Sequence, residues 1–156
     1  MSLLPFFRWF QMLRVGVAIR ASTYWFPAIE VVHLFGLVLL LGPILVVDLG
    51  LLGLGMRRQA ISRVARAVAP VIWSGMTIML ATGALLLSAE AMKCYENPAF
   101  WYKMYFLAGA LLFHSTIYRW VTSSDSPERI SSTITGLLSL ALWFGVALAG
   151  RVIAFL

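Results

Sequence analysis

The sequence predicts an all-α integral membrane protein, a four-transmembrane-helix bundle with an N-terminal interfacial amphipathic helix. Of the 156 residues, 62% are hydrophobic and 12% are charged, and the mean hydropathy is +0.92. Soluble domains carry roughly a quarter of charged residues. The apolar residues form four long runs, and about 20 apolar residues per helix suffice to cross a hydrocarbon core of about 30 Å. We therefore expect a single membrane domain over residues 1–156.

Charge and cysteine content narrow the class of protein. The formal net charge is +6, but most of the arginines flank apolar runs, where they meet anionic lipid headgroups. This placement favours the lipid bilayer as the partner and argues against nucleic acid. The single cysteine, Cys94, excludes an internal disulfide and a CxxC site. We expect a multi-pass protein of the bacterial inner (cytoplasmic) membrane.

Residues 1–21 mix aromatic side chains with Arg8, Arg14 and Arg20. This stretch is too polar to span a bilayer, so we expect an interfacial helix with its aromatic rings at headgroup depth. A partly ordered tail is the alternative.

The first span is expected at about residues 25–47. Ser22 is suited to cap this helix, and Pro43 predicts a kink near its end. Gly36 and Gly42 leave room for the close approach of another helix or of a flat ligand.

One face of the first span carries its polar groups. At about 100° per residue, Glu30, His33 and Asp48 lie on the same side of the helix. Between the two carboxylates, His33 is the only ionisable side chain. This is the face on which we expect function.

The second span is expected at about residues 70–89, after a segment at 49–69 that holds four arginines and no acid. The positive-inside rule places that segment in the cytoplasm and both termini outside. Met76 and Gly83 share a face of the second span, and Thr82 is available for an interhelical hydrogen bond. The four arginines are Arg57, Arg58, Arg63 and Arg66.

A polar loop at 90–98, which ends in Asn-Pro, leads to the third span at about 99–120. Lys103, His114 and Tyr118 lie on one face of this span.

The fourth span, at about 130–155, follows a Ser-Pro-Glu capping signal at 126–128. Gly136, Ser139 and Trp143 lie near one of its faces, and nothing on this span indicates catalysis.

The chain contains two histidines, and both lie inside predicted spans. Ionisable groups at this depth are costly and usually mark a cofactor, a pathway or a paired network. The leading interpretation is that His33 and His114 are axial ligands of a b-type haem. Gly36 and Gly83 would leave space for the porphyrin, and Lys103 or Arg119 would pair with a propionate. Opposite one histidine, the candidates are Met76, Met79 or no protein group.

Three alternatives remain open. In the first, the histidines form a proton or quinone site without haem, together with Glu30, Asp48, Glu90 and Lys103. In the second, the histidines bind copper with three methionines, namely Met76, Met79 and Met104. In the third, the histidines are hydrogen-bonded packing residues.

Depth in the membrane separates the two histidines. The first and third spans are parallel, and His33 lies before the middle of its span whereas His114 lies after it, an offset of roughly 10 Å. The two axial ligands of one iron should lie at similar depth. We therefore expect one histidine to be the ligand and the other a pocket residue, with His33 preferred because carboxylates bracket it and glycines follow it.

The stretch NPAFWYKMYFLAGALLFHSTIYRW resembles a helix of the HemJ-type protoporphyrinogen oxidases, small haem-binding membrane proteins with a lysine and a histidine at the spacing of Lys103 and His114. The first span, with His33 and Gly36, is similar to their histidine-bearing helix and to the membrane domain of CopD-type copper-resistance proteins. Asp48 stands where the HemJ-type family has an arginine. The resemblance implies a haem pocket that uses His33, and with it Lys103 and His114.

Over nearly its full length, through LPFFRWF, VAIRAS, FPAIEVVHLFGL, VVDLGLLGLGMRRQ and NPAF, the chain is similar to a bacterial family of four-helix membrane proteins of unknown function. We expect a b-type haem protein that takes part in electron transfer, with a quinone or a cytochrome as redox partner. Other membrane subunits or a second copy of the chain are expected as neighbours. The alternatives are a cofactor-free structural or accessory subunit and a HemJ-like porphyrinogen oxidase.

Overall fold

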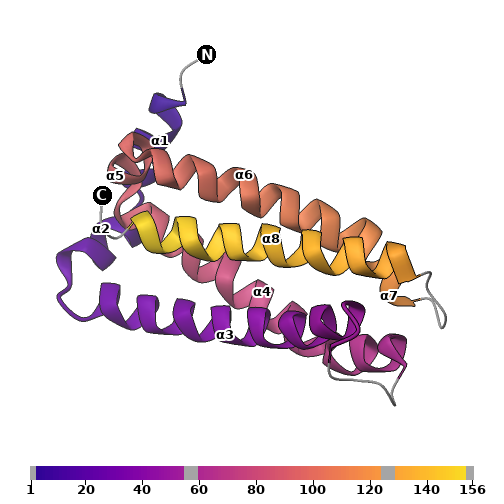
Figure 1. The fold of residues 1–156 in the computed structure, drawn as a ribbon. Helices are drawn as coiled ribbons and strands as arrows, with labels where there is room; N and C mark the ends of the chain where they lie inside the picture. The colour runs from indigo at the N-terminus through magenta and orange to yellow at the C-terminus, as the bar shows by residue number, and fades with distance from the viewer. Residues whose placement is uncertain (1–2, 55–59, 124–128, 154–156) are drawn as a thin grey trace.

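The computed structural model describes residues 3–54, 60–123 and 129–153, which form helices and no strand (Figure 1). Three helices are long and apolar enough to cross a membrane. They are α3 (Trp25–Leu51), α4 (Ile61–Ala89) and α8 (Arg129–Ile153). For the described residues, the all-α prediction and the expectation of membrane-length helices are thereby confirmed.

A further helical segment runs along α8 (Figure 1). It consists of α6 (Pro98–Phe113), a π-helical turn η1 (His114–Tyr118) and α7 (Arg119–Ser123), which follow one another without a gap. The side chain of Asn97 caps α6 by accepting a hydrogen bond from the Ala99 amide at 2.9 Å. The sequence predicts one regular α-helix over 99–120, so the π-helical turn is a correction to that prediction.

The bundle is built from two helix pairs, α3 with α4 and α6 with α8, and α8 also packs against α3. Glycines allow the first pair to approach closely. A Cβ atom on Gly75 would lie 2.7 Å from the Leu40 backbone nitrogen, and one on Gly36 would lie 2.7 Å from a methyl group of Ile78. Gly36 therefore accommodates a neighbouring helix, which is the first of the two uses expected for this glycine.

The helix limits differ from the predicted spans in three places. Helix α4 begins at Ile61 and continues through Pro70, so the segment before Pro70 is helical. Helix α3 extends beyond residue 47 to Leu51. The predicted polar loop at 90–98 contains a short helix, α5 (Ala91–Glu96). The predicted N-cap at 126–128 and two of the predicted cytoplasmic arginines, Arg57 and Arg58, lie outside the described residues.

The N-terminal segment forms two helices in place of one, α1 (Leu4–Gln11) and α2 (Arg14–Ala21). The backbone between them is extended at Leu13, with φ −58° and ψ 137°. Phe7 is buried against Ala91 and Phe100. This part of the chain packs on one end of the bundle.

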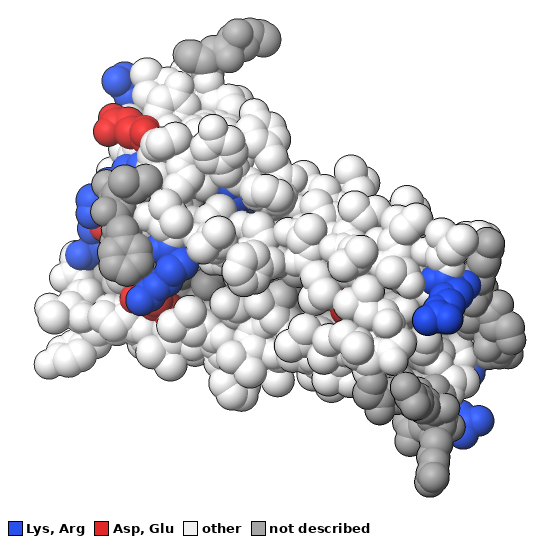
Figure 2. Space-filling model, viewed as in Figure 1, with Lys and Arg blue, Asp and Glu red and all other residues white. Residues whose placement is uncertain are grey.

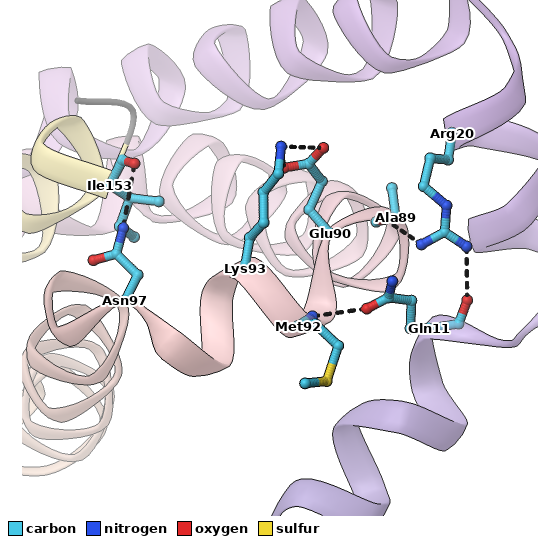
Figure 3. A network of polar contacts seen from close by, with 8 residues as sticks. All are labelled: Gln11, Arg20, Ala89, Glu90, Met92, Lys93, Asn97 and Ile153. Carbon is cyan, nitrogen blue, oxygen red and sulfur yellow. Dashed lines mark hydrogen bonds and ion pairs between the residues drawn. The ribbon is translucent and has the colours of Figure 1, made fainter. Parts of the chain in front are cut away.

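Hydrogen bonds tie the N-terminal helices to that end of the bundle (Figure 3). The Arg20 guanidinium donates to the Ala89 carbonyl at 2.9 Å and to the Gln11 carbonyl at 3.1 Å. The Gln11 side chain accepts from the Met92 amide at 2.8 Å. Arg20 thus satisfies a carbonyl at the C-terminus of α4, which has no partner within its own helix.

Charged side chains gather at the two ends of the bundle face shown in Figure 2, and the broad middle of that face is almost entirely uncharged. Large apolar side chains are exposed on α3, α6 and α8, among them Val31, Phe35, Val38, Leu112, Phe144 and Leu148. This distribution matches a hydrocarbon layer around the middle and headgroups at both ends.

Candidate functional site

The first candidate centre is the half-buried imidazole of His33 on α3. Its Nδ1 atom lies 2.8 Å from the hydroxyl oxygen of Thr82 on α4. That hydroxyl donates its single proton to the Ile78 carbonyl at 2.5 Å. Since the Thr82 oxygen has no second proton to give, it must accept from His33, and we assign the ring proton to Nδ1. The neutral ring then presents the lone pair of Nε2.

The surroundings of this ring come from two other helices, α4 and α6. A Cβ atom on Gly83 of α4 would lie 3.3 Å from the imidazole carbon Cε1, so the glycine makes room for the ring edge. Lys103 of α6 is close enough to act electrostatically on the ring. The Lys103 ammonium also lies beside Gly150 of α8, where a Cβ atom would be 3.5 Å from Nζ. We call His33, Thr82, Gly83 and Lys103 the His33 site.

The second histidine lies in a different environment. His114 is buried and begins the π-helical turn, and its ring stacks on Tyr118 at a centroid distance of 4.5 Å. The rings of Trp73 and Trp143 meet it edge-on at 6.2 Å and 6.3 Å. π-Helical turns inside α-helices occur frequently at functional sites.

The two histidines stand at separate levels of the bundle. His33 contacts α4 at Thr82, whereas His114 contacts it at Trp73. These positions are nine residues apart, which corresponds to about 14 Å along the helix. The structure therefore does not bring both imidazoles to one iron, and the offset has the direction expected from the sequence.

A cluster of buried polar groups surrounds His114. Tyr118 of η1 and Ser139 of α8 face the carboxyl group of Asp48 at interaction distance, but neither hydroxyl reaches the geometry of a formed hydrogen bond. We call this group the Asp48 cluster, and its members have exposed fractions between 0% and 5%. They are Asp48, His114, Tyr118, Ser139 and Trp143.

Other residues expected at a cofactor site lie elsewhere. Glu30 is exposed on α3 and does not point into the bundle with His33. Met76 is buried in an apolar core with Leu40 and Ile72, about 9 Å along α4 from Thr82. Met104 is exposed, so the methionines do not converge on a copper ion. Within the described ranges, no three His, Cys, Asp or Glu side chains form a group able to hold a metal ion.

Three members of the Asp48 cluster were not assigned to a site from the sequence, namely Tyr118 on the third span and, on the fourth span, Ser139 and Trp143. The latter two were placed near one face of the fourth span, and the structure shows that this face is buried. The available signal was the spacing of four residues between these polar-tipped side chains in an otherwise apolar run. That signal gains meaning only once α8 is known to pack on α3.

Comparison with known proteins places the chain in a family. A family model described as a family of unknown function (DUF6644) matches residues 6–156. Comparisons with curated proteins and with solved structures gave no match. The chain belongs to the DUF6644 family.

Proposed function

We propose that this protein is a multi-pass protein of the bacterial inner membrane in which His33 holds a b-type haem, and that it takes part in electron transfer. The observation that carries the proposal is the hydrogen bond from His33 to Thr82, which directs the Nδ1 proton away and leaves the Nε2 lone pair available. A ligating histidine usually donates its other ring N–H to such a partner.

The membrane arrangement has four spans in this proposal. Segment α6 has 16 residues, fewer than the roughly 20 that a span needs. The five residues of η1 and the five of α7 extend it as one continuous helical segment. The uncharged middle of the bundle then lies in the hydrocarbon layer, and the two short N-terminal helices lie at headgroup depth.

The residues of the His33 site fit one side of a haem. Imidazole is a standard axial ligand of haem iron, and Thr82 fixes the ring orientation and increases the basicity of Nε2. Lys103 provides a positive charge near His33 for a propionate. When bound, the haem supplies one-electron chemistry at its iron. His114 belongs to another level of the bundle and is not expected to complete the ligand set.

A cofactor-free structural or accessory subunit is the second candidate function. Exposed apolar side chains on the outer faces of α3, α6 and α8 favour it, because such faces suit contact with partner helices as well as with lipid. A second copy of the chain or other membrane subunits would be the partners. A HemJ-like porphyrinogen oxidase remains an alternative from the sequence resemblance.

Haem stoichiometry separates these candidates. The protein is purified in detergent from cells supplied with haem, and its haem content is measured as the pyridine haemochrome. We expect about one b-type haem per chain, since a single His33 site is present. A folded, monodisperse preparation without haem would overturn the haem proposal and favour the structural subunit. Electron transfer is then tested by reduction of the bound haem with a quinol or a reduced cytochrome.

A further inference from the structure

The Asp48 cluster contains six buried polar atoms for which the structure shows no hydrogen-bond partner. They come from α3, η1 and α8, and they include both carboxylate oxygens of Asp48. The others are His114 Nδ1, Tyr118 OH, Ser139 Oγ and Trp143 Nε1. A buried polar group left without a partner costs roughly 1–3 kcal/mol. Such a concentration at one place indicates a site and not ordinary packing.

The charge of this cluster decides what it binds. Among the described residues, no lysine or arginine forms an ion pair with Asp48, and the one ion pair found joins Lys93 to Glu90. An ionised carboxylate buried in a membrane bundle without a counter-charge is very costly, whereas a protonated carboxyl group is much less so. We propose that the Asp48 cluster is a proton-binding site, in which the Asp48 carboxyl group carries an exchangeable proton.

The groups around Asp48 suit this role. The titratable Tyr118 faces Asp48 from η1, and the neutral Ser139 faces it from α8. His114 stacks on Tyr118, and the neutral indole of Trp143 meets His114 edge-on. The indole of Trp73 on α4 contacts the His114 ring edge-on. Arg119 of α7 is exposed, and its positive charge acts electrostatically on His114. A protonated Asp48 gains one donor, which the facing hydroxyl oxygens of Tyr118 and Ser139 are able to accept.

Asp48 lies near one end of the bundle. It lies three residues before the end of α3 at Leu51, about 4.5 Å along the helix. The proton is exchanged with solution at that end of the bundle, where Arg63, Arg66 and Arg129 are exposed. Only the carboxyl O–H bond forms and breaks. The site lies far from His33, because fifteen residues of α3 separate them by about 22 Å, and it does not depend on a haem.

Infrared spectroscopy of the full-length protein in liposomes tests this proposal. At neutral pH we expect the C=O band of a protonated carboxyl group, which shifts when water is replaced by D₂O. The band should be absent from Asp48→Asn, which resembles the protonated side chain in shape and charge. It should persist in Glu30→Gln, the matched control, because Glu30 is an exposed acid on the same helix.

Tyr118→Phe is the second test and keeps Asp48 in place. Since the Tyr118 hydroxyl faces the carboxyl group, its removal should displace the band without abolishing it. The proposal is overturned if the wild-type protein shows no protonated carboxyl band at neutral pH. It is equally overturned if the band survives in Asp48→Asn or is unmoved by Tyr118→Phe.

Discussion

The hydroxyl oxygen of Thr82 lies 2.8 Å from the Nδ1 atom of His33 across the interface of α3 and α4. The same oxygen donates to the carbonyl of Ile78 within α4. The threonine therefore determines both the tautomer and the orientation of the imidazole. The proposal that His33 holds a haem rests on this hydrogen bond between side chains of α3 and α4.

Thr82→Val should weaken haem retention by about 10–100-fold, because the ring then loses the partner that orients it. Haem loss to an excess of a haem-binding acceptor protein measures the change. Thr77→Val is the matched control, since Thr77 donates to the Trp73 carbonyl in the same way but is exposed. Equal haem loss from both variants would show that the Thr82 contact has no part in binding.

Gly75→Ala should destabilise the bundle by about 1–3 kcal/mol, the usual cost of overpacking. The added methyl group would lie 2.7 Å from the Leu40 backbone nitrogen, which cannot move without shifting α3. At Gly42, nothing lies within 4 Å of the added methyl group. Gly42→Ala should therefore stabilise the helix, by about 0.5–1 kcal/mol. Thermal unfolding in detergent compares the two, and a Gly75→Ala variant as stable as Gly42→Ala would contradict the close helix contact.

Arg20→Met should loosen α1 and α2 without unfolding the bundle. The substitution removes the hydrogen bonds to the carbonyls of Ala89 and Gln11. Amide hydrogen exchange should become faster in residues 4–21 and remain unchanged in α3 and α4. Arg14→Met on the same helix serves as control, since no such contact is seen for Arg14. Unchanged exchange in Arg20→Met would mean that apolar packing around Phe7 alone holds the N-terminal helices.

The helices could be predicted from the sequence because each depends on a long apolar run, but their limits depend on finer effects. The second span was predicted from about residue 70, whereas α4 begins at Ile61 and continues through Pro70, which is exposed. A π-helical turn adds one residue to a turn and leaves the apolar pattern of 99–120 nearly unchanged. The alternation of arginines and aromatic side chains before residue 21 is equally compatible with one helix and with two, so it did not predict the break between α1 and α2.

The candidate sites could be predicted only as far as single helix faces allow. His33, Lys103, His114 and Tyr118 were identified as polar groups on faces of two predicted spans. In the structure His114 and Tyr118 are buried, and His33 and Lys103 are half-buried. The contact of His33 with Thr82 depends on how α3 and α4 are aligned along their axes. The residue pattern of a single helix face does not determine that alignment. Glu30 shares the face of His33 but lies one turn nearer the end of the helix, where the bundle no longer covers it.

The reduced-minus-oxidised absorption spectrum of the purified protein tests the central claim most directly, measured for wild type, His33→Ala and His114→Ala. We predict a b-type α-band in wild type, its loss in His33→Ala and its retention in His114→Ala, because His114 lies about 14 Å away along α4. All three proteins must first be shown to be folded and monodisperse. A b-type band that survives in His33→Ala, or no band in wild type from cells supplied with haem, would contradict the assignment of haem to His33.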